Sequence, residues 1–247
     1  MRATKIEFHL RMVIMIVIVT LGFWAPWIEA WGIGQRISLW EWLALSISRM
    51  SGASFAAAAP LVIILAAFFA AMGAALRIWG TAWLGYATVH HVKMQAGEVL
   101  TDGPYRYVRN PLYLGGWFMM AATSFIMPPT GALFSMTLLT VFFLRLILGE
   151  EAFLAGQLGE PYRDYLRAVP RLVPRLRATL PPSGRKPQWV YALLTEINPI
   201  GIFVTLAFLS WSYNNWLMIK AIIVSLGISL VVRALMPGIL REPDQAG

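Results

Sequence analysis

Two arginines and an Asn-Pro pair lie close together in residues 101–113 and could bind an anionic group. Asn110 is a preferred N-cap residue and Pro111 is favoured at the first position of a helix, so the pair predicts a helix start. The free N–H groups and positive dipole end of such a start favour a carboxylate or phosphate. Arg106 and Arg109 could support that anion from one side, or extend to lipid phosphates instead.

Three tyrosines, Tyr105, Tyr107 and Tyr113, accompany these arginines. Tyrosine is common in the aromatic belts at membrane interfaces. Alternatively, the rings could form the wall of a pocket, because aromatic faces attract cations such as a sulfonium. Gly115-Gly116 follows directly, and glycine allows a ligand to approach the backbone closely. The clustering favours a pocket wall, and the belt stays the alternative.

A second polar group, Glu150-Glu151, follows around forty residues later at the end of an apolar run. Two carboxylates at the C-terminal end of a helix oppose the helix dipole and require cationic partners. Arg145 precedes them, and Arg163 and Arg167 follow. The pattern predicts either an ion-paired elbow or a carboxylate that binds a ligand's ammonium or hydroxyl groups. Arg145, inside the apolar run, is expected to face the bundle or a cavity.

The composition indicates that a polytopic membrane protein positions these groups. Of the 247 residues, 58% are hydrophobic and 13% are charged, which is too much apolar surface for a soluble domain. The net charge of +8 is expected to reflect arginines facing anionic lipid rather than nucleic acid. With no cysteine and three histidines, the chain offers no disulfide and no convincing metal site.

The apolar stretches predict an all-α bundle of about six transmembrane helices. Pro128-Pro129 predicts a tight hairpin between the third and fourth helices, and residues 212–215 predict another between the last two. Residues 36–50 predict a short amphipathic helix at the membrane interface. The six stretches are 12–31, 55–77, 111–127, 131–149, 190–211 and 216–235.

Basic residues are distributed unequally between the two sides of this predicted bundle. With the N-terminus on the cytoplasmic side, residues 150–189 alone bring seven basic residues to that side, whereas the opposite side holds only Arg36 and Arg49. Cytoplasmic loops are enriched in lysine and arginine. Both termini and both polar groups are therefore predicted on the cytoplasmic face.

Five motifs follow one another within residues 73–175, namely Leu76-Arg77-Ile78-Trp79, 101–113, Glu150-Glu151, 158–165 and Val169-Pro170-Arg171. In order and spacing they resemble the integral membrane methyltransferases that use S-adenosylmethionine. This superfamily includes isoprenylcysteine carboxyl methyltransferases and phospholipid N-methyltransferases. The family usually has histidine where Asn110 stands; asparagine retains hydrogen bonding but cannot act as an acid or base near neutral pH.

The resemblance implies methyl transfer from S-adenosylmethionine to a lipophilic acceptor, such as an isoprenylcysteine-type carboxylate or a lipid amine. The expected partners are membrane lipids and a lipophilic or lipid-modified substrate, with no nucleic acid and no metal. Catalytic roles are predicted for Arg109, Arg145 and Glu151. The predicted cofactor-binding residues are Tyr105, Arg106, Val108, Arg109, Asn110, Pro111, Tyr113, Gly115, Glu150 and Glu151.

We expect a methyltransferase core over 1–187 and a C-terminal transmembrane hairpin with a short tail over 188–247, separated by a linker at 179–188. Two other functions stay open. One is an NADPH-dependent sterol-type reductase, a class with a related Gly-Pro-Tyr…Arg-His-Pro motif. The other is a non-catalytic membrane protein whose arginines only anchor its cytoplasmic face. Binding of S-adenosylhomocysteine or of NADPH distinguishes these functions.

Overall fold

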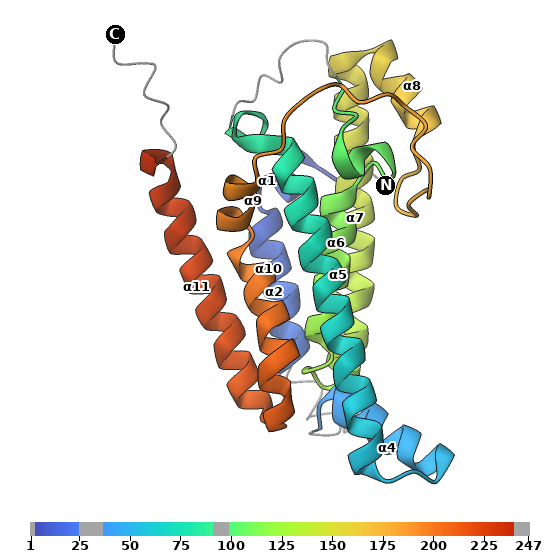
Figure 1. Ribbon diagram of the computed structural model, residues 1–247, viewed down its shortest axis with the longest axis vertical. Helices are drawn as coiled ribbons and strands as arrows, with labels where there is room; N and C mark the ends of the chain where they lie inside the picture. Colours follow the sequence, from blue (N-terminus) through green and yellow to red (C-terminus); the bar gives the residue numbers. More distant parts are fainter. Residues whose placement is uncertain (1–2, 25–36, 91–98, 240–247) are drawn as a thin grey trace.

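The computed structural model describes residues 3–24, 37–90 and 99–239, and all regular elements in these ranges are helical. The long helices run side by side as an elongated bundle (Figure 1). At its centre, α6 (Pro111–Ser124) packs against both α5 (Phe55–His90) and α7 (Pro129–Leu158). The predicted all-α class is therefore confirmed.

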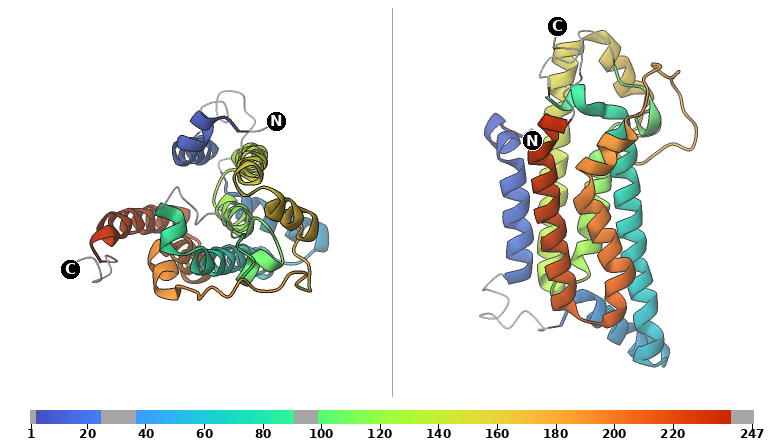
Figure 2. Two further views of the ribbon diagram at one scale, coloured as in Figure 1. Left: turned by 90° about the horizontal axis from the view of Figure 1, so that it is seen from above. Right: turned by 60° about the vertical axis from the view of Figure 1, so that its left-hand side comes forward.

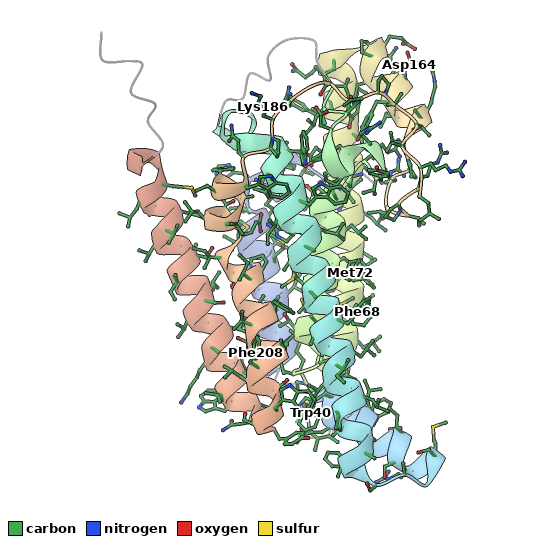
Figure 3. The ribbon with its side chains drawn as sticks, in the orientation of Figure 1. Trp40, Phe68, Met72, Asp164, Lys186 and Phe208 are labelled. Carbon is green, nitrogen blue, oxygen red and sulfur yellow. The ribbon has the colours of Figure 1, made fainter. Side chains whose placement is uncertain are left out.

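Other helices pack on the two sides of this central group. α2 (Arg11–Trp24) packs against α7, and α9 (Trp189–Thr195) and α10 (Ile197–Val204) pack against α5. α11 (Asn215–Ile239) packs on α10 and lies at the edge of the bundle when it is seen along its axis (Figure 2). Apolar side chains such as Phe68, Met72 and Phe208 lie midway between the two ends of the bundle, as expected of a membrane-spanning protein (Figure 3).

Within the described residues, three helices are long and apolar enough to cross a membrane, namely Phe55–Gly85, Pro129–Leu158 and Asn215–Met236. The bent pair Trp189–Thr195 and Ile197–Ser212 forms a fourth if it is one span. Both α2 and α6 have 14 residues, which at about 1.5 Å per residue reach about 21 Å of a hydrocarbon core about 30 Å thick. Part of the first predicted span lies outside the described residues. The described helices indicate an integral membrane protein, and a six-span arrangement stays a prediction.

α5 continues beyond the predicted 55–77 and kinks at Gly85, where φ is 71°. Its small residues Ala66, Ala70 and Ala74 are buried in the main apolar cluster. α6 approaches this helix closely, since a Cβ added to Gly73 would lie 2.9 Å from the carbonyl oxygen of Gly115. These small residues therefore form a seam at which the two helices are in close contact.

The two ends of the bundle differ in their connections. At one end, α6 stops at Ser124 and α7 starts with Pro129 at its first position, which confirms the predicted hairpin. The same end carries α4 (Leu39–Ser51), close to the predicted 36–50 and started by a capping box of Ser38 and Glu41. The opposite end carries α1 (Lys5–His9) and α8 (Glu160–Ala168), as Figure 1 shows.

The predicted span 190–211 is broken rather than continuous, with a bend of 66° between α9 and α10 at Glu196. Pro199 explains the break, because proline has no N–H to donate to the carbonyl of Thr195 four residues earlier. Arg233 of α11 donates to that carbonyl instead, from Nε at 3.1 Å and Nη2 at 2.5 Å. The chain continues through a π-helical turn, Thr205–Leu209, and a short 3-10 turn, Ser210–Ser212.

Candidate functional site

The start of α6 and the end of α7 meet at the end of the bundle that α8 covers, where polar side chains gather near Asp164 and Lys186 (Figure 3). Asn110 occupies the N-cap position of α6, but its side chain makes no capping hydrogen bond. Its amide nitrogen donates to Glu151 Oε1 at 3.1 Å and to the carbonyl of Arg171 at 3.2 Å. The predicted helix start at Asn110-Pro111 is therefore confirmed. The amide of Asn110 joins two of the motifs that carry the resemblance, which we name together the signature.

Glu151 is 5% exposed and is the centre of a cluster of cations. Arg171 donates from Nε and Nη2 to Glu151 Oε2 at 3.1 and 2.8 Å. Arg109 places its Nε 3.3 Å from Glu151 Oε1, an ion-pair distance, although this buried nitrogen makes no hydrogen bond to the described residues. Arg109 Nη1 donates to the carbonyl of Leu166 at 2.7 Å.

The partners of the carboxylates therefore differ from those expected from sequence order. Arg163 and Arg167 pair with acidic residues of α8 itself rather than with Glu150 or Glu151. Arg171 takes their place, a residue of the motif Val169-Pro170-Arg171 for which no role in the site was predicted. Its position directly after two motif residues was the available signal.

Glu150, the neighbouring carboxylate, has a different environment. The hydroxyl of Tyr113 donates to Glu150 Oε2 at 2.9 Å. Its Oε1 accepts no hydrogen bond from the described residues. The ring of Tyr113 packs edge-on against Phe143 of α7, with the centroids 5.7 Å apart, and this contact holds the hydroxyl towards α7. Glu150 thus keeps acceptor capacity that Glu151 has already used.

Arg145 is separated from this cluster. It pairs with Glu7 of α1, with Nη2 at 2.8 and 2.9 Å from the two carboxylate oxygens, and its carbonyl accepts the N–H of Ala3 at 3.0 Å. Glu151 lies six positions further along α7, which turns the two side chains about 120° apart around the helix. Hydrogen bonds from Arg145 and Thr4 lower the pKa of Glu7 to about 2. A catalytic role for Arg145 stays a prediction.

Residues 101–113, which we name the tyrosine–arginine loop, pack against α8. Tyr105 is in the short 3-10 helix Gly103–Arg106, and its carbonyl accepts the hydroxyl of Tyr165 at 2.9 Å. Desolvation of these buried phenols raises the pKa of both Tyr105 and Tyr165 above the usual value. Val108 is buried as well. Tyr105 is therefore part of the packed wall of the loop, whereas the ring of Tyr107 lies against that of Trp79, with the centroids 6.0 Å apart.

Residues 169–188, which we name the strap, form hydrogen bonds with this loop and are not an unattached linker. Arg109 N–H donates to Pro170 O at 2.9 Å, and Arg175 N–H donates to the carbonyl of Tyr107 at 3.0 Å. Arg106 Nε donates to Leu180 O at 3.0 Å, so this predicted cofactor-binding residue holds the strap. Near the other end, the buried carboxylate of Asp102 accepts hydrogen bonds from residues 183–185.

Comparison with known proteins gives a consistent picture. Residues 44–160 match the family model described as phospholipid methyltransferase. The chain is 32% identical over 111 residues, 43% of its length, to Protein-S-isoprenylcysteine O-methyltransferase of Schizosaccharomyces pombe. It is 40% identical over 74 residues, 30% of its length, to Methanethiol S-methyltransferase of Crocosphaera subtropica. No solved structure matches the chain.

The matched regions cover 47% of the first relative and 28% of the second, so the chain spans less than half the length of either. The family-model match contains Asn110, Glu150 and Glu151, but it ends before Arg171 and the helices α9–α11. The predicted resemblance to the isoprenylcysteine and phospholipid methyltransferases is confirmed.

Proposed function

We propose that this chain, whose sequence resembles membrane methyltransferases of the isoprenylcysteine and phospholipid type, transfers a methyl group from S-adenosylmethionine to a lipophilic acceptor. One observation carries the proposal. Asn110, Arg109 and Arg171, from different parts of the signature, converge on the single buried carboxylate of Glu151. A signature kept only to anchor loops at the surface would not require a buried, charged junction.

The side chains at this junction fit the charged groups of S-adenosylmethionine. The cofactor has a carboxylate, an ammonium and a methyl-bearing sulfonium. Arg109, with a buried Nε that lacks a hydrogen bond, would hold the carboxylate. Glu150, with a carboxylate oxygen still free to accept, would hold the ammonium. Glu151 is already neutralised by Arg171 and Arg109, so we assign it the role of orienting Arg109.

Alignment and exclusion of water are the contributions we assign to the chain's own residues. A carboxylate acceptor is already nucleophilic and needs no base, whereas an amine acceptor must lose a proton first. Asn110 cannot accept that proton near neutral pH. The site is therefore best suited to an acceptor that is an anion when it reacts. We further propose that it faces the cytoplasm, because the strap and its arginines lie at this end of the bundle.

Calorimetric titration of the detergent-purified chain with S-adenosylhomocysteine and with NADPH tests this function. We expect saturable binding of S-adenosylhomocysteine alone. Glu150→Gln should weaken that binding by about tenfold, because a charge-assisted hydrogen bond is lost. Glu160→Gln on the exposed face of α8 is the matched control and should bind as the wild type does. Binding of NADPH alone would instead indicate a reductase.

A further inference from the structure

Arg77 and Glu196 form an ion pair inside the bundle, and neither residue has a predicted catalytic or cofactor-binding role. Arg77 belongs to the apolar segment Phe55–Gly85, and Glu196 belongs to the break between α9 and α10. Arg77 donates from Nε to Glu196 Oε2 at 2.6 Å and from Nη2 to Oε1 at 3.0 Å. A charged side chain within a membrane span is costly and usually faces a partner, a cavity or a substrate path.

Glu196 is fully occupied, whereas Arg77 is not. The hydroxyl of Thr81 donates to Glu196 Oε1 at 2.7 Å, so both carboxylate oxygens have donors, and the side chain is 4% exposed. The side chain of Arg77 is 26% exposed. Its Nη1 donates no hydrogen bond to the described residues. One nitrogen of the guanidinium, with two N–H groups, is therefore available to a ligand.

Two glycines of α6 make room beside this guanidinium. A Cβ added to Gly115 would lie 2.7 Å from Arg77 Cγ, and a Cβ added to Gly116 would lie 3.8 Å from Arg77 Nη1. The guanidinium therefore extends across α6 towards Phe143, which would be 3.3 Å from the same Cβ of Gly116. Because Gly115 is a predicted cofactor-binding residue, a group bound at Nη1 would be next to the predicted cofactor site.

The local charge balance is positive. Arg233 of α11 donates to Thr195 O, directly before Glu196, so two arginines and one glutamate meet at the break. The net charge of these three side chains is +1, and Coulombic attraction is strong where water is largely excluded. A negatively charged group would balance it.

We propose that Arg77 determines substrate specificity by binding an oxyanionic group of the lipophilic acceptor, a carboxylate or a phosphate, through Nη1, while Glu196 holds the guanidinium in position. The inference rests on the proposed methyltransferase function and specifies its substrate class. Each of the two N–H groups of Nη1 can donate a charge-assisted hydrogen bond to an oxygen of a carboxylate or phosphate. A neutral acceptor such as an alkyl thiol would gain nothing from Arg77.

The test compares ligands that differ only in the oxyanion, with the full chain in nanodiscs saturated with S-adenosylhomocysteine. The first pair is S-farnesylcysteine and its methyl ester, and the second is a phosphatidic acid and the matching diacylglycerol. The wild type should bind one acidic ligand at least about tenfold more tightly than its neutral counterpart, and which pair shows this preference identifies carboxylate or phosphate. Arg77→Gln should reduce the preference to within about twofold. Arg163→Gln on α8 is the matched control.

The outcomes separate this inference from the function on which it rests. No S-adenosylhomocysteine binding by the wild type contradicts the proposed function. Normal S-adenosylhomocysteine binding with no acid preference in either pair, or a preference that survives in Arg77→Gln, overturns the role of Arg77. Should Arg77→Gln not fold, Arg77→Lys is the second variant. It keeps the charge but has one nitrogen where arginine has separate nitrogens for Glu196 and for the ligand, and it should retain a preference for the acidic ligand of only about threefold. If Arg77→Lys prefers the acidic ligand as strongly as the wild type does, the inference is also overturned.

Discussion

At the scale of single residues, the two adjacent glutamates have different tasks because they point in different directions from α7. Glu151 is directed into the cluster of Asn110, Arg109 and Arg171, whereas Glu150 meets only the hydroxyl of Tyr113. A buried carboxylate with three polar partners stabilises the junction of three segments, and a carboxylate with one partner keeps capacity for a ligand. The pair therefore combines a structural and a binding role.

Removing the Glu151 carboxylate should destabilise the protein. Glu151→Ala leaves Arg109, which is 9% exposed, without its partner, and breaking a buried pair in this way costs about 3–5 kcal/mol. Thermal unfolding in detergent would measure the loss. Glu160→Ala removes only exposed ion pairs and should lower the melting temperature much less. Equal melting temperatures for the two variants would contradict the assignment.

The Glu7–Arg145 pair makes stability depend on acid pH. The pKa of Glu7 is lowered to about 2 in the folded protein by Arg145, below its ordinary value of 4.5. The stabilisation is therefore complete above pH 4.5 and is lost as the pH falls towards 2. Unfolding midpoints measured over this interval should decline less steeply for Glu7→Gln than for the wild type. Parallel curves for both proteins would show that the pair contributes nothing.

At the scale of elements, the site depends on the close approach of α5 and α6. The glycines at their crossing bring the two backbones together, and the Arg77 side chain passes over α6 at the same place. The break between α9 and α10 has a similar effect, because it turns Glu196 towards α5. Backbone irregularities thus position the buried charges.

A methyl group at the crossing should disturb both elements. Gly115→Ala would place a Cβ 2.7 Å from Arg77 Cγ and 3.0 Å from the carbonyl oxygen of Gly73, so the helices must separate, at a cost of about 1–3 kcal/mol. Gly156→Ala, also helical, meets nothing within 4 Å and should stabilise the protein by about 0.5–1 kcal/mol. Thermal unfolding of both variants measures these changes. An unchanged melting temperature for Gly115→Ala would show that α5 and α6 are not closely packed at their crossing.

At the scale of the whole molecule, the bundle is polar at one end. The tyrosine–arginine loop, the strap and α8 lie there with α1, while α4 lies at the other end (Figure 1). This arrangement agrees with the predicted accumulation of basic residues on one side of a membrane. Its orientation in the membrane stays a prediction from the distribution of charge.

Cysteine labelling can test that orientation, because the chain has no cysteine of its own. Leu176→Cys lies in the strap at a position that is 99% exposed, and Ser51→Cys lies at the exposed end of α4. In intact cells a membrane-impermeant maleimide should label Ser51→Cys only, and Leu176→Cys should react after the membrane is opened. The reverse pattern would place the site on the outer face.

The sequence by itself determined what depends on local pattern. Long apolar runs dictate membrane helices, Pro128-Pro129 forces the hairpin, and the alanines repeated every four residues of α5 form a seam because that spacing repeats on one face of a helix. The motif residues also indicated the resemblance to membrane methyltransferases before any contact was known.

The tertiary structure decided which charges meet. Arg163 and Arg167 are closer to Glu151 in the chain than Asn110 is, yet α8 directs them to its own acidic residues. Arg171 reaches Glu151 because the strap returns along the loop, and Arg145 reaches Glu7 because α1 lies beside α7. Local sequence dictates backbone periodicity within a segment, whereas the pairing of long side chains depends on which helix faces pack together.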